Sequence, residues 1–327
     1  MSSRDAAAAD SEVAVELLPF ICLYKSGRIE RLIGNDTVPA SLDATTGVDS
    51  KDVTIDPTTN LSVRLYLPTS AISAKEKLPI VVYFHGGGFM VESAASVGYH
   101  RYLTALADRA RAVAVSVDYR RVPEHRLPAA YDDSWAALKW TLASATNGGG
   151  SAHEPWLAAH GDASRVFLAG DSAGANIAHN VAMRAAAEDL PSPSAAIIKG
   201  VMLIHPYFWD GSNTMGAELE DRIRREWRFM TGDDDARVDD PRLAPTSSAA
   251  PSLALMPTER VLVAVAGEDF LAPKGRAYYA ALLASGWRGE AELVDTPGED
   301  HVFHLLQPGT EAAAEMMDRV TAFIARS

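Results

Sequence analysis

The sequence predicts a doubly wound α/β fold, in which helices cover both faces of a mostly parallel β-sheet. Several short apolar runs, most of them rich in β-branched residues, lack a clean alternation of apolar and polar positions. Strands that are buried on both faces have this pattern. Segments with helical spacing separate most of the runs. Strands that alternate with helices in this way build a parallel sheet, here of about eight strands.

The beginning of the chain departs from this alternation. Residues 1–11 are rich in Ala, Ser and Asp, and we expect them to be disordered. Residues 15–27, "VELLPFICLYKSG", form a short apolar stretch that is expected to pack as a helix. "KDVTID" (51–56) and "LSVRLYLP" (61–68) alternate apolar and polar side chains, which predicts half-buried antiparallel strands.

The remaining elements follow in turn. Strands are expected over residues 79–84, 112–117, 165–170, 201–206, 260–267 and 291–296. Helices are expected over residues 99–110, 129–144, 173–188, 274–286 and 309–327. One charged and aromatic segment, residues 207–250, contains no strand pattern and is too long for an ordinary connection. We expect it to lie over the carboxyl edge of the sheet, where ligands bind in such folds.

Composition limits the partners and the compartment. The net charge of −13 argues against binding to nucleic acid or to an anionic membrane, which needs a basic surface. A single cysteine, Cys22, excludes an internal disulfide and suits a reducing compartment. The N-terminus carries charges where a signal peptide needs an apolar core. We therefore expect a cytoplasmic protein, with the nucleus as a second location, that acts on a small molecule.

The segment 168–180, "LAGDSAGANIAHN", supplies a candidate nucleophile. It contains the pattern G-x-S-x-G around Ser172, between the apolar run "RVFLA" and a helical pattern. A sharp strand-to-helix turn needs small neighbours and exposes the serine Oγ at the sheet edge. The same five residues also occur as an ordinary glycine turn. The strand before them and the helix after them favour the nucleophile.

A serine nucleophile needs a base, and four histidines follow Ser172. His179 lies two helical turns further on and is expected to be structural, whereas His205 ends a strand beside a proline and is expected to pack. "GEDHVFHLL" follows the last strand, where the base belongs in this chain order. His301 lies in the loop and is the predicted base. His304 enters an apolar stretch and is expected to be a satisfied, partly buried histidine.

The carboxylate that orients the base is expected at the end of another strand. "VLVAVAGEDFLAP" ends a strand with Glu268 and Asp269, which places both at the same edge. Asp269 is preferred because the apolar pattern resumes directly after it, and Glu268 is the fallback. A metal site in "EDHVFH" is the alternative. It lacks a third ligand cluster at the spacing of metal sites, so no metal or other cofactor is expected.

Three glycines follow an apolar strand in "YFHGGGFM" (83–90), and they supply the last candidate group of the site. A phosphate-binding loop would need a following Lys or another glycine spacing. Attack of Ser172 on a carbonyl creates an oxyanion, which is stabilised by main-chain donors after the nucleophile and in an earlier loop. The expected donors are the N–H groups of Gly87, Gly88 and Ala173. His85 and Gly86 are expected to support the loop.

Five motifs together resemble those of plant carboxylesterases of the hormone-sensitive lipase group: "HGGGF", "DYRRVPEHRLPAAYDD", "GDSAGANIAH", "DDPRLAP" and "GEDHVFHL". The resemblance extends from Pro19 almost to the C-terminus. It implies that residues 1–327 form a single α/β-hydrolase domain with a triad matching Ser172, Asp269 and His301. It also implies a helical cap built from residues 12–45 and 206–250. Where relatives often read "DYRLAPEH", this chain carries Arg121 and Val122.

The resemblance implies a serine carboxylesterase but leaves two alternatives open. Similar proteins include gibberellin receptors, which lack the triad histidine, and hydroxyisoflavanone dehydratases, which tend to carry Thr at the nucleophile. The presence of His301 and Ser172 favours an esterase. A capped apolar pocket is expected to select small, moderately apolar esters. The aromatic residues expected in that pocket are Phe20, Tyr24, Trp227 and Phe229.

Overall fold

The computed structural model describes residues 11–146, 154–188, 190, 198–209 and 216–326. Almost all of the segment expected to be disordered, residues 1–11, therefore lies outside the described residues. The strands of the main sheet are Val48–Asp56 (β4), Leu61–Pro68 (β5), Leu78–Phe84 (β6), Val113–Asp118 (β7), Gly161–Asp171 (β8), Ile198–Ile204 (β9), Thr258–Ala266 (β10) and Glu290–Thr296 (β11).

These eight strands are ordered β11-β10-β9-β8-β6-β7-β5-β4. All neighbours from β11 to β7 pair in parallel, whereas β5 pairs antiparallel with both β7 and β4. The expected mostly parallel sheet with antiparallel strands near the N-terminus is confirmed. Because the parallel strands run the same way, their carboxyl ends share one edge of the sheet.

The burial of the central strand β6 explains why its sequence does not alternate apolar and polar residues. All of its residues are buried. Ile80, Val82 and Phe84 belong to one hydrophobic cluster, whereas Val81 and Tyr83 belong to another. Consecutive side chains of a strand point to opposite faces, so each cluster occupies one face of the sheet. Both faces are covered, and polar residues have no place in the strand.

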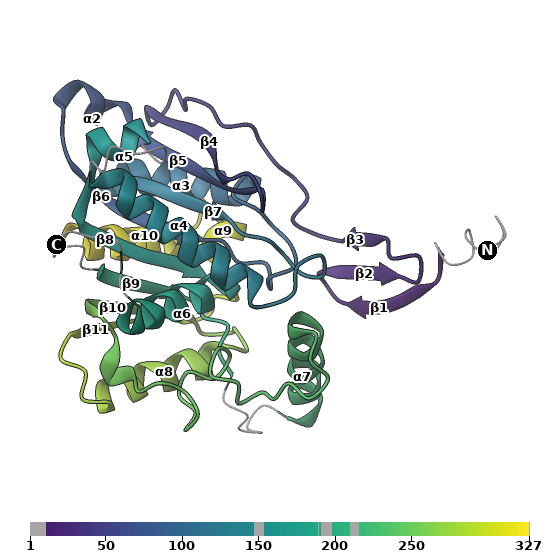
Figure 1. Cartoon of the computed structure of the whole chain (residues 1–327). Helices are drawn as coiled ribbons and strands as arrows, with labels where there is room; N and C mark the ends of the chain where they lie inside the picture. The colour runs from purple at the N-terminus through teal and green to yellow at the C-terminus, as the bar shows by residue number, and fades with distance from the viewer. Residues whose placement is uncertain (1–10, 147–153, 189, 191–197, 210–215, 327) are drawn as a thin grey trace.

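Helices lie on both faces of the sheet (Figure 1) and contribute side chains to the two hydrophobic clusters. Side chains of α3 and α10 pack in one cluster, and those of α4, α6 and α8 pack in the other. The helices are Thr69–Ala74 (α2), Val97–Ala110 (α3), Ala129–Ala145 (α4), Pro155–His160 (α5), Ala173–Ala187 (α6), Ala217–Thr231 (α7), Ala272–Ala284 (α8), Phe303–Leu306 (α9) and Glu311–Ala325 (α10), with a 3₁₀ turn at Leu253–Leu255 (η1). The five helices expected from the sequence are all present.

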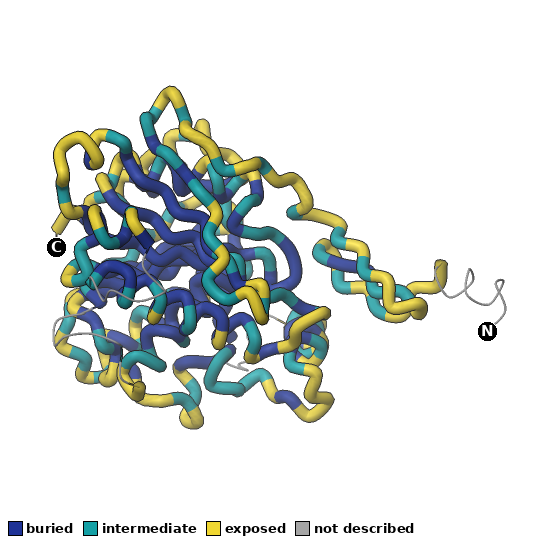
Figure 2. The backbone as a smooth tube through the Cα atoms, turned by 45° about the horizontal axis from the view of Figure 1, so that its top comes forward, coloured by how far each residue is buried: buried dark blue, intermediate teal, exposed yellow. Residues whose placement is uncertain are grey.

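The helix expected over residues 15–27 is wrong. The segment instead forms a small antiparallel sheet of Val13–Leu17 (β1), Ile21–Tyr24 (β2) and Ile29–Arg31 (β3). Pro19 interrupts the segment, and a proline inside a helix removes a hydrogen bond and clashes with the preceding turn. The chain turns there, with the Phe20 N–H donating to the Leu17 carbonyl at 2.8 Å. Figure 2 shows this sheet as a mostly exposed arm beside the buried core.

The second segment outside the sheet contains α7. This helix buries one face, which includes Ile223 and Trp227, and leaves its other side polar. The guanidinium of Arg222 on α7 donates to the Leu18 carbonyl at 3.4 Å, so the helix contacts the N-terminal segment. In the part of the chain that the structure describes, no helix is long and apolar enough to cross a membrane.

Candidate active site

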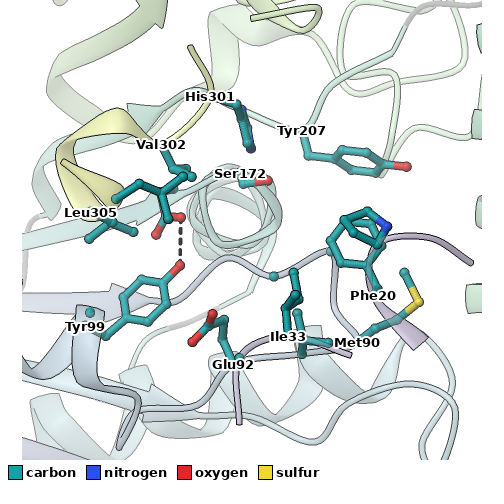
Figure 3. Close-up of a pocket in the computed structure, with 18 of the residues that line it drawn as sticks. Phe20, Ile33, Met90, Glu92, Tyr99, Ser172, Tyr207, His301, Val302 and Leu305 are labelled. Atoms are coloured by element: carbon teal, nitrogen blue, oxygen red, sulfur yellow. Dashed lines mark hydrogen bonds between the residues drawn. The ribbon is translucent and has the colours of Figure 1, made fainter. Parts of the chain in front are cut away.

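Ser172 lies in the turn between β8 and α6. Its backbone has φ 55° and ψ −119°, a region that residues other than glycine rarely occupy. The turn is fixed on both sides, because the Ser172 N–H donates to the Ile204 carbonyl at 2.9 Å and the Ser172 carbonyl accepts from the Tyr207 N–H at 3.0 Å. Strain of this kind persists only where the surroundings enforce it. It directs the side chain into a cavity at the sheet edge (Figure 3).

The glycines around Ser172 are required by close packing. A Cβ on Gly174 would lie 1.9 Å from the carbonyl oxygen of Phe84, and a Cβ on Gly170 would lie 2.4 Å from the carbonyl oxygen of Gly174. Both contacts are with backbone atoms, which cannot move aside as a flexible side chain could. The end of β6 therefore packs directly against the turn.

Asp269 and His301 follow neighbouring parallel strands. Asp269 comes after β10 and His301 after β11, which brings both to the edge where Ser172 lies. His301 Nδ1 is 2.7 Å from Asp269 Oδ2. Because an ionised carboxylate only accepts hydrogen bonds, Nδ1 carries the hydrogen and Nε2 is left as the basic nitrogen. Figure 3 shows the His301 ring above Ser172.

The environment distinguishes Asp269 from the fallback carboxylate. Asp269 is buried, and its Oδ1 accepts from the Leu271 N–H at 2.8 Å. Glu268 is exposed and does not line the cavity. Only Asp269 is brought to His301.

His205 supports the loop that carries His301. The sequence predicted only a packing role for this residue. Its Nδ1 accepts from the Val302 N–H at 3.0 Å, next to His301 in the chain. Burial holds the pKa of His205 well below its usual value, so the ring is neutral. A neutral ring places no positive charge beside the His301 imidazole.

Three side chains, two of which belong to the predicted triad, could also gather around a cation. Single ligand atoms of His205, Asp269 and His301 lie within 4.8 Å of one another, so the third ligand that the sequence lacked is supplied by His205. However, His301 Nδ1 bonds to Asp269 and His205 Nδ1 bonds to Val302. A metal bound through these atoms would compete with the hydrogen bonds that orient His301.

Two other histidines lie away from the cavity. His179 is buried, with its Nδ1 3.0 Å from the Tyr278 hydroxyl, which fits the expected structural role. His304 was expected to be a satisfied, partly buried residue, and that expectation is wrong. It is buried, and among the described residues neither ring nitrogen has a hydrogen-bond partner. Burial lowers its pKa to about 3, so the ring packs as a neutral group against Tyr102 and His205.

The glycine loop follows β6, and two of its residues, Gly87 and Gly88, line the cavity. Gly87 and Gly88 have φ 89° and 59°, which favour glycine. A Cβ on Gly87 would lie 2.4 Å from the Val91 carbonyl oxygen. Within the described chain, neither glycine N–H donates to a protein acceptor. The N–H of Ala173 opens α6, and such first-turn groups have no partner inside their own helix.

Two tyrosines contact His85 and Gly86 at the start of this loop. The His85 ring stacks on Tyr119 at 4.2 Å between centroids, and the Tyr119 hydroxyl donates to the His85 carbonyl at 2.8 Å. Burial lowers the pKa of His85 to about 3. The Gly86 N–H donates to the Tyr99 hydroxyl at 2.7 Å.

Asp171, the residue before Ser172, connects the two halves of the site, and sequence reasoning missed it. Its Oδ2 accepts from the Tyr99 hydroxyl at 2.8 Å and its Oδ1 from the Tyr83 hydroxyl at 2.9 Å. Tyr99 thus links the carboxylate beside the nucleophile to the Gly86 N–H. Burial raises the pKa of Asp171 to about 6. Its position inside G-x-S-x-G was the only sequence signal.

Ser172, His301, Gly87 and Gly88 line one cavity of about 520 Å³. Of the four aromatic residues expected there, only Phe20 lines it. The expectation for the others is wrong. Tyr24 bonds through its hydroxyl to Glu30 at 2.6 Å. Trp227 is buried and donates to Asp240, and Phe229 packs against the core.

Helical spacing explains why Trp227 misses the cavity. The residues of α7 that line it are Arg222, Glu226 and Met230, each four positions from the next. Such residues form one stripe on a helix. Trp227 belongs to the neighbouring stripe, which is buried in the core. The 222-226-230 spacing was a readable signal in the sequence, but the buried side of the helix was not known.

Comparison with known proteins connects this site to a family. A family model described as alpha/beta hydrolase fold matches residues 81–305. The chain is 47% identical over 322 residues to tuliposide A-converting enzyme 1, chloroplastic, of Tulipa gesneriana, which covers 97% of this chain and 79% of that protein. It is 46% identical over 327 residues to probable carboxylesterase 13 of Arabidopsis thaliana, which covers 96% of this chain and 98% of that protein.

A solved structure agrees with these relatives. The chain is similar to an esterase of Pyrobaculum calidifontis, with a TM-score of 0.66 and 30% identity over 85% of this chain and 84% of that one. None of these names favours the receptor or the dehydratase alternative. The chain belongs to the α/β-hydrolase family and is a carboxylic ester hydrolase of the plant carboxylesterase type.

Proposed function

We propose that this protein hydrolyses small, moderately apolar carboxylic esters through a serine acyl-enzyme. The observation that carries the proposal is one cavity lined by Ser172, His301, Gly87 and Gly88, with Asp269 bonded to His301 from behind the lining. Nucleophile, base and oxyanion donors are the three components of acyl transfer by a serine enzyme.

The proposed reaction needs no cofactor. Ser172 Oγ attacks the ester carbonyl carbon while His301 Nε2 takes its proton, and Asp269 holds the imidazole in the required tautomer. The carbonyl oxygen becomes an oxyanion, which the N–H groups of Gly87, Gly88 and Ala173 stabilise. His301 then protonates the leaving alcohol. Water attacks the acyl-enzyme by the same steps and releases the acid.

The shape of the cavity supports the proposed substrate size. Apolar side chains from both outer segments, including Phe20, Ile33 and Met230, line a volume of about 520 Å³. We propose that residues 12–45 and 206–250 act as the cap over it, within a single domain of residues 1–327. A cavity of this size favours short acyl and alcohol groups over long chains.

The proposal includes a cytoplasmic location, with the nucleus as a second one. The tulip relative is named as chloroplastic, so the plastid is the competing compartment. Fluorescence microscopy of the full-length protein fused at its C-terminus to a fluorescent protein distinguishes them, and fluorescence confined to plastids would contradict the proposed location.

Nitrophenyl esters of increasing chain length test the activity. Wild-type protein should cleave the acetate and butyrate faster than the dodecanoate, without activation by an emulsion. Ser172→Ala should lose the turnover, because no other serine, threonine or cysteine is found among the described residues that line the cavity. A preference for dodecanoate would contradict the substrate size, and wild-type turnover by Ser172→Ala would contradict the mechanism.

A further inference from the structure

Glu92 places a carboxylate in the cavity without a protein partner. It lines the cavity together with Ser172 and Tyr99, and Figure 3 shows its carboxylate between Tyr99 and Ile33. Among the described residues, this carboxylate makes no hydrogen bond and no ion pair. Its backbone is also strained, with φ 68°, which is costly for a glutamate.

The position of Glu92 is fixed from two sides. A Cβ on Gly34 would lie 2.9 Å from Glu92 Oε1, and a Cβ on Gly87 would lie 3.0 Å from Glu92 Cγ. The side chain therefore runs in a space that exists because both neighbours are glycines. Arg121, where the chain departs from many relatives, donates to the main-chain carbonyl of Glu92 and holds the backbone.

Two other carboxylates of the cavity lining already have side-chain hydrogen-bond partners. Asp171 accepts two tyrosine hydroxyls. Glu226 accepts from Arg222 at 2.8 Å, which uses the arginine of the cavity lining. Asp36 is a further acidic residue, exposed in the cavity lining. Among the described residues of the cavity lining, Glu92 and Asp36 thus keep carboxylates that form no ion pair.

This charge has a cost for the proposed reaction. The tetrahedral intermediate places an oxyanion at Gly87 and Gly88, and the Glu92 side chain runs beside Gly87. Two negative charges so placed repel each other. A substrate that brings a hydrogen-bond donor or a positive charge to Glu92 removes that repulsion, whereas an aliphatic substrate leaves the carboxylate without a partner.

We propose that Glu92 is a specificity-determining residue that accepts hydrogen bonds from a hydroxyl or ammonium group of the ester. The preferred substrates then carry such a donor close to the scissile bond, and esters with a carboxylate are rejected by like charge. This inference rests on the proposed esterase activity and adds the substrate class to it.

Isosteric pairs of butyrate esters test the inference. The 2-hydroxyethyl ester is paired with the propyl ester, and the choline ester with the 3,3-dimethylbutyl ester, with kcat/KM followed by acid release in a pH-stat. Wild-type protein should favour the donor in at least one pair by about tenfold. The pair with the larger ratio identifies the donor as a hydroxyl or a cation.

Glu92→Gln removes the charge and keeps the shape. The ratio within each pair should fall towards one, and the anionic ester 4-(butyryloxy)butanoate should gain relative to the propyl ester. Ratios cancel any general loss of activity. Glu268→Gln is the matched control, because it removes an exposed carboxylate near Asp269 that does not line the cavity. Its ratios should equal those of the wild type.

Gly34→Ala tests the same inference without replacing Glu92, because the added Cβ meets both the main-chain nitrogen and the carboxylate of Glu92 and should displace them. Its ratios should also fall, with a melting curve to verify that the variant is folded. Wild-type ratios near one, or ratios that Glu92→Gln leaves unchanged, would overturn the role of Glu92. The esterase mechanism would instead fail if Ser172→Ala cleaved the propyl ester at the wild-type rate, so the two failures are distinguishable.

Discussion

The sheet edge and the two segments that cover it are held in place by different means. At the edge, Ser172 and the glycine loop are fixed by backbone contacts so close that a single Cβ on Gly174 would collide with Phe84. The cover, which is the proposed cap, includes the exposed arm β1–β3 and the polar helix α7 (Figure 1). It reaches the edge through side chains such as Phe20, whose ring would lie 3.1 Å from a Cβ on Gly88.

This difference suggests that the edge carries out the reaction and that the cover selects the substrate. A site fixed by backbone geometry has little freedom to change and is suited to holding reacting groups within a few tenths of an ångström. A cover that touches the site through side chains can change its contacts without disturbing the turn. We therefore expect substitutions at the edge to lower kcat and substitutions in the cover to alter KM and selectivity.

The largest effect is expected for His301→Ala at the edge. Without a base the Ser172 hydroxyl is a weak nucleophile, so kcat should fall by about 10⁴-fold or more. His301 is partly exposed, so the melting temperature should change little. Steady-state kinetics with nitrophenyl butyrate and a thermal melt measure both. A loss of less than tenfold in a folded variant would remove His301 from the mechanism.

A smaller loss is expected for Gly87→Val in the glycine loop. The added side chain collides with the Val91 carbonyl, and the loop has a positive φ there, so its N–H donors should move. Loss of one oxyanion donor typically costs about 10²–10³ in kcat. Gly309→Ala is the control, because a Cβ there meets nothing within 4 Å. Equal kcat in the two variants would mean that the glycine loop is only a turn.

Two tyrosines of α3 offer a matched pair for the hydrogen bonds behind the loop. Tyr99→Phe leaves the Gly86 N–H without its acceptor and takes one donor from Asp171. It should lower the free energy of unfolding by about 1–3 kcal/mol and kcat by about tenfold. Tyr102→Phe removes a hydroxyl with no partner among the described residues.

Tyr102→Phe should therefore leave the urea unfolding curve unchanged or move it to higher urea. Both variants remove one buried hydroxyl from the same helix, so only the lost hydrogen bonds differ. If the two curves moved by the same amount, the hydrogen bonds that join Asp171 through Tyr99 to the glycine loop would not contribute to stability.

The smallest effect is expected in the cover. Phe20→Ala removes a ring that lines the cavity and should raise KM by about fivefold to tenfold, or about 1–1.4 kcal/mol, with kcat changed much less. Tyr24→Ala alters the same small sheet away from the cavity and should leave KM unchanged. A larger change in kcat than in KM for Phe20→Ala would contradict the division between edge and cover.

The sequence predicted the edge well because its signals are local. A glycine pattern between a strand and a helix fixes the turn at Ser172, and strand order brings Asp269 and His301 beside it. The cover was predicted poorly because its structure depends on distant contacts. Pairing of β1 with β2 overrode an apolar stretch that looked helical, and which stripe of α7 faces the cavity depends on what packs behind it.

The supporting residues of the edge were missed for the same reason. Tyr99 and Asp171 are 72 positions apart in the chain, and His205 and Val302 are 97 apart. No local pattern marks such a hydrogen bond. Spacing therefore predicts which residues react, whereas the contacts that hold them require the folded structure.

Covalent labelling tests the central claim, that Ser172 is activated by His301 and Asp269, most directly. A fluorophosphonate reacts with an activated serine and leaves an adduct that peptide mass spectrometry can locate. Wild-type protein should carry one adduct, on the peptide that contains Ser172, with loss of esterase activity in proportion to labelling. His301→Ala should label far more slowly. An adduct on another residue, or labelling of Ser172 at an equal rate in His301→Ala, would contradict the account.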